Sequence, residues 1–156
     1  MAADLLYKVA YDEAVRALSE QQGVIDSLRS RAGLLFSAAA ITTSFLGAQA
    51  LRGGGSTLAS WPALLCFVAV AGASIAVFWP RRWEVTADPR HVIESYVESA
   101  EPVSVENLHR DLSLHMHNSY LENHEGLEQL ALFLRVAGCF LTLEVVLWII
   151  AIATRH

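Results

Sequence analysis

The chain has 156 residues, of which 54% are hydrophobic and only 17% are charged, and its mean hydropathy is +0.38. A soluble domain averages about 25% charged residues, so this composition argues against an ordinary soluble protein. The net charge of −5 provides no overall attraction to nucleic acid.

The N-terminal stretch predicts a long amphipathic helix. Over residues 4–31, seam positions recur at alternating spacings of four and three, the heptad pattern of a helix that packs along one seam. These positions are Tyr7, Tyr11, Ala14, Leu18, Gln21, Ile25, Leu28 and Ala32, and the spacing continues through Leu35, Ala39, Thr42, Leu46 and Gln49. We therefore expect one helix that runs from a cytoplasmic part, residues 1–32, into the membrane. The seam fits packing against the same chain and packing in an oligomer equally well.

Three apolar blocks predict membrane-spanning helices, at residues 33–51, 62–79 and 136–153. A helix needs about 20 apolar residues to cross the core of a bilayer, and each block is close to that length. The first two blocks form a predicted transmembrane hairpin, residues 33–80, joined by a glycine-rich turn. The third block and its short tail occupy residues 136–156.

The positive charges set the expected orientation of the chain. Most of them flank one side of the apolar blocks, at Lys8, Arg16, Arg29, Arg31, Arg81, Arg82, Arg90 and Arg110, whereas the other side carries Arg52 and Arg155. Lys and Arg accumulate on the cytoplasmic side of a membrane. We therefore expect the N-terminus and residues 81–135 in the cytoplasm, and the C-terminus outside.

Residues 81–135 predict a cytoplasmic helical region. Asp88–Pro89 is a typical helix start, and a short helix with an apolar face at Ile93 and Tyr96 is expected to end at Glu101–Pro102. Ser104 is expected to cap a second helix that runs without a strong stop through the third apolar block. Its seam is spaced alternately by three and four, at Leu127, Leu130, Leu134, Ala137, Leu141, Glu144 and Trp148.

Glu144 is the residue in the apolar blocks that most directly indicates function. A carboxylate at mid-membrane costs about 2.5–3.5 kcal/mol on insertion scales, and such residues usually face protein or water. Glu144 and the pair Thr42–Thr43 are central in their blocks, so we expect them at the same depth. One interpretation is that Glu144, Thr42, Thr43 and Gln49 line a pore or gate. The other is that a protonated Glu144 bonds to a threonine hydroxyl and holds the helices together.

Other candidate sites lie in the cytoplasmic region. The group Arg81, Arg82, Arg90 and Arg110 fits lipid headgroups or an anionic ligand such as a nucleotide or oligonucleotide. The histidines between 109 and 124 are typical of a solvated helix face, although metal binding or pH sensing is conceivable. Cys66 and Cys139 are expected to be buried. We find no nucleophile–base arrangement, metal motif or cofactor motif, so we predict neither an enzyme nor a metal or cofactor site.

The layout resembles that of the small bacterial membrane effectors of the Pycsar and SLATT type. The resemblance rests on the stretch from Leu28 to Leu35 that leads into a small-residue span, and on a cytoplasmic helical insert that feeds the last span. It implies a homo-oligomer in the bacterial inner (plasma) membrane that permeabilises the membrane in anti-phage defence. It also implies a cyclic-nucleotide or nucleic-acid-derived signal made by a cognate nucleotidyl transferase or cyclase.

The sequence therefore predicts an all-α, polytopic membrane protein with three transmembrane helices, long cytoplasmic extensions and an oligomeric bundle. We expect a channel or pore-forming effector that contacts the lipid bilayer and is gated from the cytoplasm. The alternative is a non-conducting membrane scaffold or partner-binding subunit.

Overall fold

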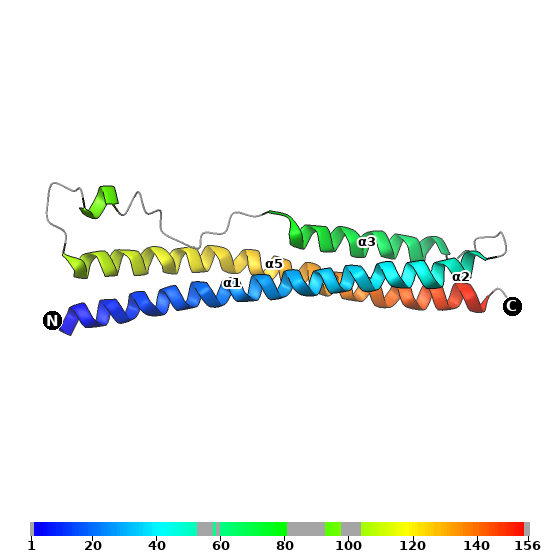
Figure 1. Ribbon diagram of the computed structural model, residues 1–156, viewed down its shortest axis with the longest axis horizontal. Coiled ribbons are helices and arrows are strands. Elements are labelled where there is room, and N and C mark those ends of the chain that lie inside the picture. The colour runs from blue at the N-terminus through cyan, green and yellow to red at the C-terminus, as the bar shows by residue number, and fades with distance from the viewer. Residues whose placement is uncertain (1, 53–57, 59, 81–92, 98–103, 155–156) are drawn as a thin grey trace. The chain divides into compact units, whose positions relative to one another are not determined.

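The computed structural model describes residues 2–52, 58, 60–80, 93–97 and 104–154, and this part of the chain is helical without any strand. Its elements are α1 (Ala2–Thr42), the π-helical turn η1 (Thr43–Gly47), α2 (Ala48–Leu51), α3 (Ser60–Phe78), the π-helical turn η2 (Ile93–Val97) and α5 (Val105–Ala153) (Figure 1). The all-α prediction is confirmed for these residues.

The start of α5 is set by the predicted capping residue. The backbone N–H of Asn107 donates to Ser104 Oγ at 3.2 Å, and that of Leu108 donates to Ser104 O at 3.1 Å. These bonds satisfy amide groups that a helix N-terminus would otherwise leave unpaired. The proposed helix signals at Asp88–Pro89 and Glu101–Pro102 lie outside the described residues.

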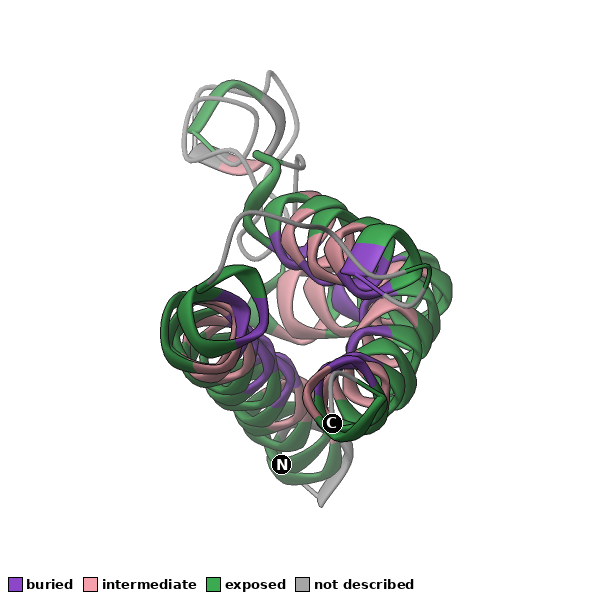
Figure 2. Ribbon diagram, turned by 90° about the vertical axis from the view of Figure 1, so that its right-hand side faces the viewer, coloured by how far each residue is buried: buried purple, intermediate pink, exposed green. Residues whose placement is uncertain are grey.

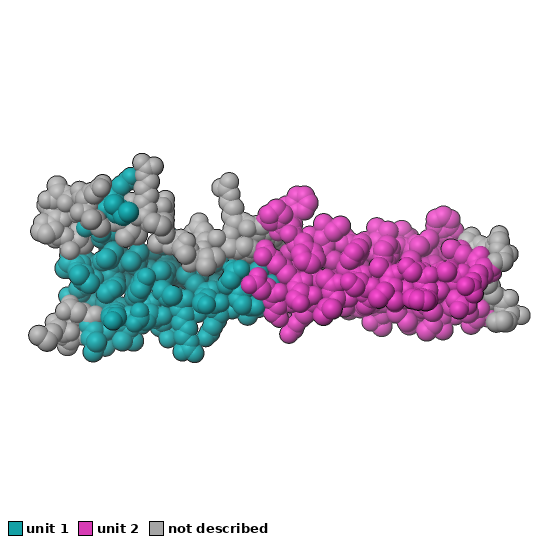
Figure 3. Space-filling view, in the orientation of Figure 1, with its two compact units in different colours: residues 1–25, 81–127 teal, residues 26–80, 128–156 magenta. Residues whose placement is uncertain are grey.

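The chain divides into two compact units. The first unit comprises residues 1–25 and 81–127, and the second comprises residues 26–80 and 128–156 (Figure 3). The division cuts across the predicted linear segments, because α1 and α5 each contribute one stretch to each unit.

In the first unit, α1 packs against α5 along the predicted seam. Leu18 and Ile25 are buried on α1, and Met116 is buried on α5. Gln21 is also buried, and its Nε2 donates to the backbone carbonyl of Tyr120 at 3.0 Å. The seam of this unit therefore packs within one chain, which was one of the two hypotheses that the spacing left open.

In the second unit, α3 completes a bundle with α1 and α5. Its buried residues lie on one face of the helix (Figure 2), and two of them, Ala63 and Val70, belong to two clusters of mainly small residues. One cluster contains Ala39, Val70 and Ala137, and the other contains Ala50, Ala63, Trp148 and Ala151. Small residues at these contacts let helices approach closely, as is typical of helices that associate in membranes.

The turn η1 shifts the register of the first helix by one residue. The heptad spacing predicts Gln49 on the seam, but Gln49 is exposed, and Gly47 and Ala50 are buried instead. A π-helical turn accommodates one more residue than an α-helical turn, so every later position moves along by one. The sequence pattern of threes and fours contained no signal for this extra residue.

The three long helices support membrane association. Within the described residues, the helices at Leu5–Leu51, Ser60–Phe78 and Val105–Ala153 are long and apolar enough to cross a membrane. On α3, the large apolar side chains of Trp61, Leu65, Val68 and Ile75 are exposed. A continuous exposed apolar surface of this kind is unfavourable in water and normal in lipid. Of the two cysteines, both expected to be buried, Cys66 is buried and Cys139 is exposed.

We predict that Gly47→Leu destabilises the second unit by about 1–3 kcal/mol, the usual range for overpacking. A Cβ atom at Gly47 would approach the indole ring of Trp148 to 3.2 Å, and Trp148 is fully buried, so neither side can yield easily. The measurement is denaturant unfolding in detergent. Gly72→Leu is the matched control, because a Cβ at Gly72 meets nothing within 4 Å. Equal stability of the two variants would contradict the prediction.

We predict that Gln21→Met stabilises the first unit by about 1 kcal/mol. The Oε1 atom of Gln21 is buried and has no hydrogen-bond partner among the described residues. Replacing such a group with an apolar one of similar shape removes its desolvation penalty. The substitution also removes the bond from Gln21 Nε2 to the carbonyl of Tyr120, but this carbonyl lies inside α5 and keeps its helix hydrogen bond. Hydrogen exchange of the surrounding amides measures the effect, with Gln22→Met as the control on the neighbouring position. A loss of protection would contradict this prediction.

Candidate functional site

Glu144 lies in the interior of the second unit. Its side chain, on α5, is fully buried, with a relative exposure of 0%. The hydroxyl of Thr43 donates to Glu144 Oε1 at 2.5 Å. The other carboxyl oxygen, Oε2, is buried without a hydrogen-bond partner in the described part of the chain. This bond places Thr43, one residue of the threonine pair, against Glu144.

The surroundings of Glu144 follow from the local helix geometry. Thr43 is the first residue of η1, so the π-helical turn begins where the hydroxyl meets the carboxyl. Trp148 lies one turn beyond Glu144 on α5, and its ring packs over Gly47 at the end of η1. A large side chain on one helix thus requires a glycine on the other.

The indole N–H of Trp148 is a second buried polar group at this site. Its Nε1 is near the Glu144 carboxyl but outside hydrogen-bond geometry, and it has no partner among the described residues. Cys66, on α3, is also buried and close enough to Glu144 to interact electrostatically. All three long helices therefore contribute a polar or polarisable side chain around one carboxyl group.

The other predicted pore residues occupy different surroundings. Thr42 is half-buried, and the bond to Glu144 comes from Thr43. Gln49 is exposed, because of the register shift at η1. The structure thus brings Thr43 and Glu144 together, and it places Gln49 on the outer surface of the second unit.

The predicted basic group is only partly described. Arg110 is exposed on α5 in the first unit, whereas Arg81, Arg82 and Arg90 lie outside the described residues. That this group of arginines binds lipid or an anionic ligand is a hypothesis.

Sequence reasoning missed two residues of this site. Trp148 was recognised as a seam residue, but its buried N–H was not considered as part of the polar group around Glu144. Gly47 was not singled out at all. The signal in the sequence was that tryptophan, the largest residue type, lies on α5 near the level at which the first helix has glycine, the smallest.

The described residues contain no group of three or more His, Cys, Asp or Glu side chains that could hold a metal ion. On α5, His115 and His117 are exposed, and the ring of His109 lies 5.5 Å from that of Tyr11, measured between centroids. The hydroxyl of Tyr96 in η2 donates to Asp111 Oδ2 at 3.1 Å. Partial burial, together with this carboxylate, raises the pKa of Tyr96 above its ordinary value.

The chemistry open to the Glu144 site follows from its unpaired atoms. A carboxyl oxygen without a partner can accept a proton or bind water or a cation if the helices separate enough to admit one. In the arrangement described here the carboxyl is enclosed, and Thr43 satisfies one of its oxygens.

Comparison of this chain with family models, with curated proteins and with solved structures gave no match. The function is therefore inferred from the residues of the chain and their geometry.

We predict that Thr43→Val destabilises the second unit by about 1–3 kcal/mol, because the substitution leaves both oxygens of a buried carboxyl without a donor. Valine has nearly the same shape, so packing changes little. Unfolding in detergent, followed by circular dichroism, measures the difference. Thr42→Val is the matched control and is expected to stay within about 0.5 kcal/mol of the natural protein. Combining Thr43→Val with Glu144→Leu should recover the stability, because it removes the unpaired carboxyl.

Proposed function

We propose that this chain is an oligomeric channel or pore-forming effector of the bacterial inner membrane. In this arrangement the chain crosses the bilayer three times, with the N-terminus and residues 81–135 in the cytoplasm and the C-terminus outside. The observation that carries the proposal is the buried, half-satisfied carboxyl of Glu144 within residues 136–153, the apolar part of α5.

The energetics of burial favour a functional role for Glu144. A fully buried acidic group is costly, and an apolar residue of similar volume at such a position is often neutral or stabilising. The chain could pack α5 against α1 with leucine at position 144, as it does with Leu130. The carboxyl therefore adds something other than packing, and ion passage or gating is the usual role of an intramembrane acid.

A pore of this kind requires several copies and a change of conformation. One copy encloses Glu144, so conduction needs α1 to move away from α5 at Thr43 in an assembly that surrounds an aqueous path. We propose that a cytoplasmic signal, a nucleotide or a nucleic-acid-derived ligand, drives this change through the group Arg81, Arg82, Arg90 and Arg110. The resemblance to Pycsar and SLATT effectors supports a role in anti-phage defence beside a nucleotidyl transferase or cyclase.

The alternative function is a non-conducting scaffold that holds a partner at the membrane. One observation favours it: Glu144 is fully buried and bonded to Thr43 within a single chain, as expected of a group that only fixes helix register.

Flux measurements separate these two functions. We predict that liposomes containing the protein release a small dye or ions when a cyclic nucleotide or short oligonucleotide is added. We also predict that Glu144→Gln changes the ion flux at least tenfold while the helical content stays the same. Glu128→Gln, on the same helix, is the control. No flux under any condition would leave the scaffold function, and unchanged flux in Glu144→Gln would remove the pore role of that residue.

A further inference from the structure

The first unit carries an open groove between α1 and α5. The groove has a volume of about 440 Å³, and α1 lines it with Ala10, Glu13, Ala14 and Ala17. These four positions have the spacing i, i+3, i+4, i+7, which is that of the four residues that form a hole in knobs-into-holes packing. Three of the four are alanine, so the hole lacks the side-chain volume that would fill it from within.

In the second unit, a third helix covers one face of the pair formed by α1 and α5. There, α3 packs on α1 and α5 and makes the third helix of a bundle. In the first unit, the described segment besides α1 and α5 is the short turn η2. Tyr96 of η2 bonds to Asp111 of α5, and neither residue lines the groove. A helix pair in water that leaves such an apolar hole open needs a further helix to bury it.

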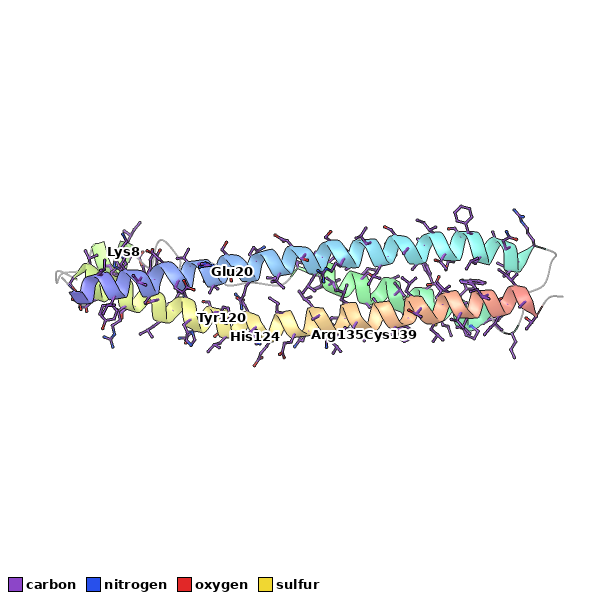
Figure 4. All side chains as sticks on the ribbon, turned by 90° about the horizontal axis from the view of Figure 1, so that it is seen from below. Lys8, Glu20, Tyr120, His124, Arg135 and Cys139 are labelled. Atoms are coloured by element: carbon purple, nitrogen blue, oxygen red, sulfur yellow. The ribbon has the colours of Figure 1, made fainter. Side chains whose placement is uncertain are left out.

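The two helices that form the groove carry different polar side chains beside it. On α1, Glu13 and Glu20 each precede a seam position and are seven residues apart. On α5, Arg110, His117 and His124 follow one another at the same interval of seven (Figure 4 labels Glu20 and His124). We call these the acidic row of α1 and the basic row of α5, the latter made of one guanidinium and two imidazoles. Glu13 and His117 are their members that line the groove, and Glu20 pairs with Arg16 on its own helix at 3.0 Å.

The two rows also match in height along the helices. Gln21 bonds to the carbonyl of Tyr120, and the ring of Tyr11 lies beside that of His109, so a residue of α1 is level with the residue about 99 positions later. Glu13 is therefore at a height between those of Arg110 and His117. A neighbour placed at the same height would set its basic row against this acidic row.

We propose that a second copy of this chain packs on the groove, parallel and at equal height, to form a four-helix bundle with two-fold symmetry. The acidic row of each α1 then faces the basic row of the partner's α5, and the partner's side chains cover the alanine-lined hole. The parallel arrangement rests on the proposed function, because two copies inserted in one membrane with one orientation share both direction and depth. The symmetry makes the interface self-complementary, with every contact present twice.

Charge reversal in the full-length protein tests this interface. Copies labelled with donor and acceptor dyes in lipid nanodiscs report self-association by energy transfer. We expect Glu13→Lys to weaken association on the order of tenfold, because each exposed pair contributes about 0.2–1 kcal/mol and the contact occurs twice. His117→Glu should weaken it similarly, and the two changes combined should restore it. Asp12→Lys makes the same charge change on α1 away from the groove and should have no effect.

Filling the groove is the second measurement. Ala10→Trp projects a large side chain from an exposed position of the groove and should shift the protein toward monomers, whereas Val9→Trp, exposed but outside the groove, should not. Association unchanged by Glu13→Lys and by Ala10→Trp would overturn this interface, and so would a natural protein that stays monomeric. Flux in the same samples distinguishes the two proposals. Intact association without any flux overturns only the channel. Flux that persists in Glu13→Lys and Ala10→Trp overturns only this interface.

Discussion

The heptad spacing shared by α1 and α5 is the constraint on which the other features of the structure depend. In each unit, the side chains buried between these helices follow this spacing on α1, with Leu18 and Ile25 in the first unit and Ala39, which packs with Ala137 of α5, in the second. Because the seam faces inward within one chain, the positions beside it decide what else the chain can bind. The alanine-lined groove and the apolar surface of α3 are both consequences of that arrangement.

The seam also explains why polar residues in it are informative. Gln21 and Glu144 lie where the pattern predicts apolar side chains, and each is buried with one oxygen that has no hydrogen-bond partner in the described ranges. A polar residue at such a position fixes which residues of two helices face each other, at a cost in stability. Gln21 bonds to a backbone carbonyl and Glu144 to a side-chain hydroxyl, so the two have different chemical possibilities. A carboxyl can gain or lose a proton and so change its charge, which an amide cannot.

The sequence was sufficient for the helices and insufficient for their details. Periodicity and the Ser104 cap predicted the course of α5, and Thr43, one of the two threonines expected near Glu144, bonds to it. These features depend on spacing within one helix or on equal distance from a membrane surface. The packing of Trp148 over Gly47 was missed because it depends on the rotation of one helix against another. The exposure of Gln49 was missed because no residue type marks a π-helical turn.

The turn η1 has a consequence for how related chains should be compared. Because it absorbs one extra residue, the part of the first helix before Thr43 and the part after Gly47 follow two different registers. An ancestral insertion within a helix is tolerated where such a turn can form, since the helix continues and only the facing residues change. A relative without the insertion would have one residue fewer between Thr43 and Ala50, and its later seam residues would keep the original heptad frame. Alignment gaps at this point would therefore mark an evolutionary change of helix face at the height of Glu144, not the end of a domain.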